Sequence, residues 1–146
     1  MTTATYNTAQ QVYDRNHGSE RLFKRPYCES LNYTEGIMDF QQSMNAFWVV
    51  DNMVSYMPQV IKAYNENQFE FYVVEICVNK EHKGYMEVFA EDYVQDVYND
   101  HIQILKQEIE YIDLPLKNNE ITTYKFFLSL SALEPVRFTF YLPSEY

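Results

Sequence analysis

The sequence contains few glycines and few cysteines, and each shortage excludes a class of site. Its 146 residues include three glycines, Gly18, Gly36 and Gly84, which lie far apart. A phosphate-binding loop needs closely spaced glycines, so the Walker and Rossmann nucleotide motifs are excluded. Two cysteines are too few for a disulfide scaffold, and no C-x-x-C or H-x-x-x-H pair indicates a metal site. We therefore expect no metal and no cofactor, and we assign no catalytic residue.

Basic residues are also scarce. The chain has 11 Lys and Arg against 21 Asp and Glu, which gives a formal net charge of −10. Direct binding of nucleic acid requires a basic surface and is disfavoured, and anionic membranes are disfavoured by the same repulsion. The charge instead favours a basic protein surface as the partner, including the surface of a complex that normally binds nucleic acid.

Long apolar runs are missing as well. The longest ones are far shorter than the roughly 20 residues that span a bilayer. No apolar run follows a basic N-terminal stretch, as it would in a signal peptide. We therefore expect a cytoplasmic protein.

The length and the apolar content suit a single domain over residues 1–146. The apolar fraction is 47%, and 14 Tyr and 10 Phe predict an aromatic core. Residues 1–18 are polar and fit either a loose N-terminal arm or a short helix.

Two amphipathic helices are predicted in the first half of the chain. Thr34 is suited to cap a helix that begins at Glu35. Apolar side chains then recur at helical spacing. They are Ile37, Phe40, Met44, Phe47, Val50, Val54 and Met57. Pro58 is expected to end or kink the second helix.

After residue 68 the apolar period changes to two, which indicates strands. Residues 69–78 alternate, and "NKEHKG" at 79–84 is typical of a hairpin turn. Further strands are predicted within residues 85–90, 101–112, 121–130 and 136–142. Helices first and strands afterwards predict an α+β fold, with the N-terminal helices packed on one face of an antiparallel sheet of four to five strands.

The stretch "EVFAEDYVQDVYNDH", residues 87–101, is strongly acidic. Its apolar and acidic stripes predict a helical insertion near 87–100, and no Lys or Arg lies within residues 84–105 to balance the acids. The stretch is either a solvated acidic face or a surface that binds a basic partner through carboxylates and aromatic anchors. The predicted partner-binding residues are Glu87, Glu91, Asp92, Tyr93, Asp96, Tyr98 and Asp100.

A second candidate site is a pocket formed by Trp48, Asp51 and Glu75. Asp51 is an acid within an apolar helix, and paired carboxylates in a pocket can carry out acid–base chemistry. The alternative is that Asp51 lies on the polar side of its helix, or accepts a hydrogen bond from a nearby backbone or hydroxyl group.

Four segments serve as family markers. They are "YTEG" at Tyr33–Gly36, "FWVVD" at Phe47–Asp51, "QEIEYIDLPL" at Gln107–Leu116 and "LPSEY" at Leu142–Tyr146. In this order they resemble a family of small uncharacterised proteins from bacteria, plasmids and phages, over residues 20–146. The resemblance implies a shared fold and a mobile-element context, and no activity. The acidic stretch replaces a short turn of the family pattern and is expected to be an addition of this protein.

The segment "LPSEY" has two interpretations. Pro143 cannot donate to a strand ladder, so it is expected to end the last strand. The residues after it either lock this end of the chain to the fold, or form a recognition site that includes Glu145.

Three functions remain open. The first is an acidic protein-binding module. In its most specific form, this module is a phage or mobile-element inhibitor that mimics nucleic acid and acts on a host nucleic-acid-handling or defence complex in the host cytoplasm. The second is a small-molecule-binding protein or enzyme with its pocket near Trp48 and Asp51. The third is a structural or oligomeric accessory protein that uses an aromatic sheet edge such as residues 136–142.

Overall fold

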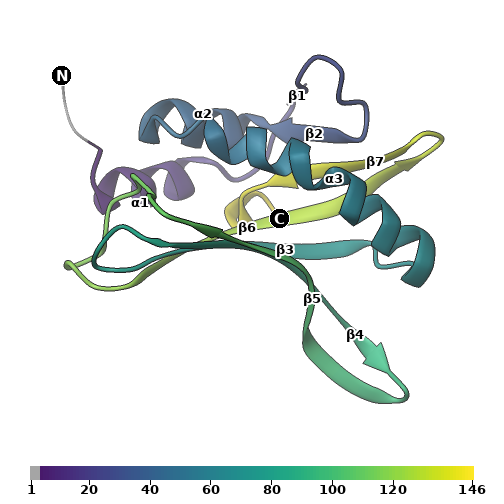
Figure 1. The fold of residues 1–146 in the computed structure, drawn as a ribbon. Helices are drawn as coiled ribbons and strands as arrows, with labels where there is room; N and C mark the ends of the chain where they lie inside the picture. The colour runs from purple at the N-terminus through teal and green to yellow at the C-terminus, as the bar shows by residue number, and fades with distance from the viewer. Residues whose placement is uncertain (1–3) are drawn as a thin grey trace.

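Helices cover one face of a seven-stranded sheet in the computed structural model, which describes residues 4–146 (Figure 1). The elements are α1 (Tyr6–Arg15), β1 (Leu22–Phe23), β2 (Leu31–Thr34), α2 (Glu35–Met44), α3 (Trp48–Asn67), β3 (Phe71–Val78), β4 (Gly84–Val94), β5 (Val97–Ile109), β6 (Thr122–Leu133), β7 (Val136–Tyr141) and the 3₁₀ turn η1 (Pro143–Glu145). The strand order is β1-β2-β7-β6-β3-β4-β5. β2 runs parallel to β7, and the other neighbours are antiparallel.

The fold class is the α+β class that the sequence predicts, but the predicted strand number is wrong. The sheet has seven strands instead of four or five. Two strands, β1 and β2, are two and four residues long. Segments of this length are too short to show a period of two, so the sequence carries no signal for them.

The helices α1 and α2 each begin after a threonine whose hydroxyl caps the helix. The Thr34 hydroxyl accepts a hydrogen bond from the N–H of Ile37 at the start of α2, which confirms the predicted cap. Thr5 caps α1 in the same way, so residues 6–15 of the polar N-terminal segment form a helix. α3 continues through Pro58 to Asn67, so of the two outcomes expected at this proline the helix end is not found.

The core lies between the helices and the sheet and is aromatic. Its largest fully buried side chains include Phe40, Tyr72, Tyr124, Phe126 and Phe138. The Phe40 ring meets the Phe126 ring edge to face, with the centroids 5.1 Å apart, and so joins α2 to β6.

β7 pairs with β6 only from Phe127 onward, and α1 lies beside the first half of β6. The hydroxyl of Tyr13 in α1 donates a 2.9 Å hydrogen bond to the carbonyl of Lys125 in this half of the strand. The strand β7 itself lies between β2 and β6. Residues 136–142 are therefore not a sheet edge, which corrects the edge expected there.

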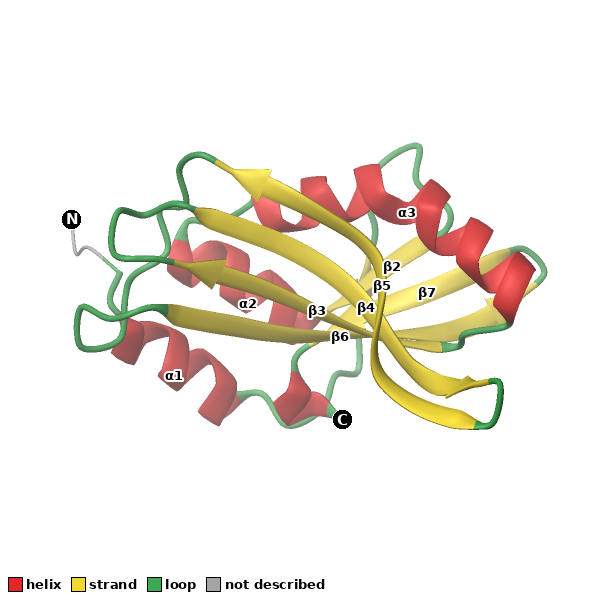
Figure 2. Cartoon of the chain, turned by 60° about the horizontal axis from the view of Figure 1, so that its bottom comes forward, coloured by secondary structure: helices red, strands yellow, loops and turns green. Residues whose placement is uncertain are grey.

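The opposite face of the sheet points away from the helical layer, and in Figure 2 it lies in front of α2 and α3. Near the last residues it carries an aromatic cluster. The ring of Phe127 lies 5.0 Å from Phe71, 5.8 Å from Tyr141 and 5.9 Å from Tyr146.

The four marker segments are connected in pairs by hydrogen bonds. Glu145 of "LPSEY" accepts hydrogen bonds from the hydroxyl of Thr34 at 2.7 Å and from the N–H of Gly36 at 3.2 Å, both in "YTEG". The indole N–H of Trp48 in "FWVVD" donates to Asp113 of "QEIEYIDLPL" at 3.2 Å. These contacts hold distant parts of the chain together, so the markers have an architectural role.

Candidate functional site

The acidic stretch forms a β-hairpin, and the predicted helical insertion near 87–100 is wrong. β4 and β5 pair up to Val94 and Val97, and the two residues between them, Gln95 and Asp96, have φ values of 52° and 64°. Two positive φ values are the requirement of a type I′ hairpin turn. The usual sequence signal for this turn is Asn-Gly. Because Gln-Asp stands here instead, the turn could not be predicted from the sequence.

Electrostatics favours the hairpin over the helix. On a helix, Asp92, Asp96 and Asp100 would lie at i, i+4 spacing on one face, where like charges repel. The hairpin places Asp92 on β4, Asp96 in the turn and Asp100 on β5. The carboxylates are thereby spread over both strands.

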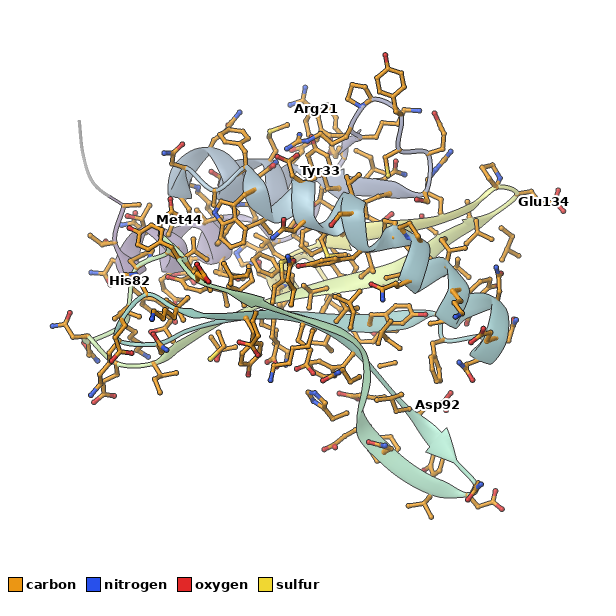
Figure 3. All side chains as sticks on the ribbon, in the orientation of Figure 1. Arg21, Tyr33, Met44, His82, Asp92 and Glu134 are labelled. Atoms are coloured by element: carbon orange, nitrogen blue, oxygen red, sulfur yellow. The ribbon has the colours of Figure 1, made fainter. Side chains whose placement is uncertain are left out.

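Two irregularities bend the hairpin. Between the pairs Val88–Leu105 and Phe89–Gln103, β5 contains one extra residue, and a second register shift follows between Ala90 and Asp92. Bulges of this kind bend a ladder and increase its twist. The tip accordingly projects from the sheet on the side away from the helices (Figure 1). Asp92 is labelled on this projecting part in Figure 3.

One side of the hairpin combines tyrosines with carboxylates. The rings of Tyr93 and Tyr98 meet at a centroid distance of 5.4 Å, and the Tyr98 hydroxyl donates a 2.9 Å hydrogen bond to Glu91. That bond raises the pKa of Tyr98, and the charges of Glu91 and Asp100 act in the same direction. Tyr98 is therefore a neutral donor at physiological pH, surrounded by anions.

Three large apolar or aromatic side chains of the hairpin are exposed to solvent. Tyr93, Val97 and Tyr98 are 68%, 67% and 52% exposed, although they are large and apolar. Val97 was not among the residues predicted from the sequence, because its only signal is a β-branched side chain beside the turn. Exposed aromatic groups within a polar surface are typical of protein-binding sites.

Six of the seven predicted partner-binding residues are exposed, and Glu87 is the exception. Glu87 is 5% exposed, and its carboxylate lies 2.9 Å from the ring nitrogen Nε2 of His101. The His101 ring in turn stacks on Phe89 at 4.0 Å. Glu87 therefore supports the base of the hairpin, while Glu91, Asp92, Tyr93, Asp96, Tyr98 and Asp100 face solvent.

The exposed carboxylates of the hairpin make no ion pair within residues 4–146. The basic residues of the N-terminal segment are already paired with other acids. Those pairs are Arg15–Asp39, Arg21–Glu35, Lys24–Glu29 and Arg25–Asp51. Among all the described residues, 4–146, no group of three His, Cys, Asp or Glu side chains is placed to hold a metal ion.

The predicted pocket of Trp48, Asp51 and Glu75 is not assembled. Trp48 is hydrogen-bonded to Asp113. The side chain of Asp51 is 64% exposed and forms an ion pair with Arg25 at 3.1 Å. Glu75 alternates with the core residues Val74 and Ile76 along β3, so it lies on the opposite face of the sheet from α3. Glu75 is thus separated from the other two residues.

These features define a small α+β protein with a helix-covered sheet and a projecting acidic hairpin. The chain belongs to a family described as a family of unknown function (DUF6876), whose model matches residues 7–146. Searches among curated proteins and among solved structures found no match. No helix within residues 4–146 is long and apolar enough to cross a membrane.

Proposed function

We propose that this protein is a binding module that docks its acidic hairpin on a basic surface of another protein. The observation that carries the proposal is the hairpin tip, where exposed Tyr93 and Tyr98 lie among carboxylates that make no ion pair within residues 4–146. Tyrosines at the centre of an interface supply apolar contact area, and surrounding charges speed association with an oppositely charged partner.

The partner is a different protein, not the basic segment of a second copy. Arg15, Arg21, Lys24 and Arg25 are engaged in ion pairs within their own chain. Recruiting them to a neighbouring hairpin would break those pairs. A partner whose basic side chains are not already paired would avoid this cost.

We extend the proposal to a target whose basic surface normally binds nucleic acid. The support is the net charge of −10 together with carboxylates carried on a projecting arm, where they can take the place of phosphates. In a phage or mobile element, such a protein would inhibit a host nucleic-acid-handling or defence complex in the host cytoplasm.

The test is an affinity capture from host lysate with three versions of the protein. The first is the wild type, and the second is Asp92→Asn/Asp96→Asn/Asp100→Asn. The third, Glu66→Gln/Glu70→Gln/Glu81→Gln, is a matched control, since it removes the same charge from exposed positions outside the hairpin. Each capture is made at about 0.1 M and about 0.5 M salt, because the Debye length falls to a few ångströms at the higher value.

We expect one basic complex that binds the wild type and the control at low salt, is lost at high salt, and does not bind the hairpin variant. Nucleic acid should compete for it. Capture of the same complex by the hairpin variant, or no stoichiometric partner at either salt, would overturn the proposal.

A further inference from the structure

The strand β5 forms one border of the sheet, and within residues 4–146 it pairs with β4 alone. The other border is formed by β1, which is two residues long. β5 contains a regular segment, Leu105–Ile109, that pairs without a shift with Gly84–Val88. Its central residues Lys106, Gln107 and Glu108 are exposed. A regular exposed border strand can pair with another strand.

We propose that the chain forms a homodimer in which Leu105–Ile109 pairs antiparallel with the same segment of a second copy, about a two-fold axis at Gln107. Such an interface uses the same patch on both subunits, as a two-fold dimer requires. The two sheets then join into one continuous sheet.

The chemistry of the paired side chains carries the proposal. An axis at Gln107 places Lys106 opposite Glu108 of the second copy, and Glu108 opposite its Lys106. It also places Leu105 opposite Ile109 of the second copy, and Gln107 opposite the Gln107 of the second copy. Each cross-strand pair then joins acid to base, apolar to apolar or amide to amide, and each kind stabilises a sheet.

Neighbouring registers lack this match. Opposite residues of an antiparallel pair point to the same face, so the axis must pass through a residue if both helical layers are to share one side. An axis at Lys106 would place two lysines opposite each other, and an axis at Glu108 would place two glutamates there. Like charges directly opposite destabilise a sheet, which leaves Gln107 as the favoured centre.

The faces of the strand suit this arrangement. Leu105 is 8% exposed and points toward the helical layer, where Gln107 accepts a hydrogen bond from Tyr56 of α3. Lys106 lies over the ring of Tyr85 at 4.0 Å on the other face. Because the axis is perpendicular to the sheet, both acidic hairpins would project from the same side of the dimer, and a partner with two basic sites would bind with avidity.

The test is the mass in solution, measured by light scattering and sedimentation from about 1 µM to about 1 mM protein, a range that covers weak dimers. We expect the wild type to be a dimer at the upper end. Lys106→Glu or Glu108→Lys alone creates like-charge pairs on both sides of the axis and should weaken the dimer about tenfold or more. The double variant Lys106→Glu/Glu108→Lys restores opposite charges and should dimerise like the wild type.

The matched controls are Lys80→Glu and Glu81→Lys, which change the charge equally in an exposed turn and should leave the dimer intact. Circular dichroism of every variant confirms that the chain is folded. A wild type that is monomeric throughout, or a double variant that stays as weak as the single ones, would overturn the proposal. Neither result bears on the binding of a foreign partner by the hairpin.

Discussion

Glu145 accepts a 2.7 Å hydrogen bond from the hydroxyl of Thr34, and the two residues lie 111 positions apart in the sequence. The same carboxylate accepts hydrogen bonds from the N–H of Gly36 and of Leu142. It therefore lies at the positive end of the α2 dipole, where an anion is stabilised. The contact fastens η1 to the first turn of α2 and supports the interpretation of "LPSEY" as a structural lock.

Gly36 leaves room for the Glu145 carboxylate, so the effect of alanine at position 36 should depend on whether Glu145 is present. A Cβ atom at position 36 would lie 2.8 Å from Oε2 of Glu145 and closer still to Oε1. Gly36→Ala should therefore lower the free energy of unfolding by about 1–3 kcal/mol. In a Glu145→Ala background the clash is absent, and the same change should raise it by about 0.5–1 kcal/mol, because alanine favours a helix. Urea denaturation of the wild type, the two single variants and the double variant measures both changes in the free energy of unfolding.

Equal effects of the alanine in the two backgrounds would show that Glu145 does not occupy this space. Glu145→Ala alone should lower the free energy of unfolding by about 1–3 kcal/mol, because the N–H groups that it serves lose their acceptor.

Arg25 is predicted to stabilise the fold through a buried amide. Its guanidinium donates to Asp51, to the hydroxyl of Tyr33 and, at 2.8 Å, to the side-chain carbonyl of Gln41, which is 0% exposed. Arg25→Met should lower the free energy of unfolding by about 2–3 kcal/mol, since it leaves the Gln41 carbonyl without a donor.

The control for this prediction is Lys24→Met. Lys24 pairs with Glu29 on the surface, and both side chains are at least half exposed. Exposed pairs contribute at most about 1 kcal/mol, so the control should change little. A similar loss in the two variants would contradict the role given to Arg25.

The turn of the hairpin gives a test that separates it from a helix. Gln95→Asn/Asp96→Gly introduces the residues that a type I′ turn prefers, and should raise the free energy of unfolding by about 1 kcal/mol by relieving two positive φ values. In a helix, the glycine would lower it by about 1 kcal/mol. The sign of the change in chemical denaturation decides between them.

Much of the architecture could be predicted from the sequence, and the errors have physical reasons. The cap at Thr34 and the alternation of residues 69–78 are local signals, and they led to α2 and to β3, which begins at Phe71. β2 depends on its pairing with β7, a contact between residues more than 100 positions apart, and its four residues show no period. The pairing of Trp48 with Asp113 likewise depends on the assembled fold.

The acidic stretch was predicted to form a helix, and it forms two paired strands instead. The residues of 87–101 show helical spacing of acids as well as alternation, and the period alone could not choose between them. The burial of Glu87 arises from its contact with His101 across the hairpin, which a helix would not have suggested.

Buried tyrosines predict a loss of stability in alkali. Burial raises the pKa of Tyr56 to about 12, and it raises the pKa values of Tyr13, Tyr72 and Tyr124 further. A group whose pKa is raised by folding contributes stability below its unfolded pKa, about 10, and loses it as the pH rises toward the folded pKa. The free energy of unfolding should therefore fall above about pH 10.

Absorbance of tyrosinate measures this prediction directly. A group of tyrosines should ionise only when the protein unfolds, in the same pH range where circular dichroism shows the loss of structure. Ionisation of all the tyrosines near pH 10 with the fold intact would contradict the burial described above.

Amide hydrogen exchange of the captured complex shows whether the partner binds on the hairpin. We predict slower exchange in the complex at residues 91–101, and unchanged exchange in α3 around Trp48 and Asp51. Unchanged exchange in the hairpin, with protection elsewhere on the molecule, would show that the partner binds at another site.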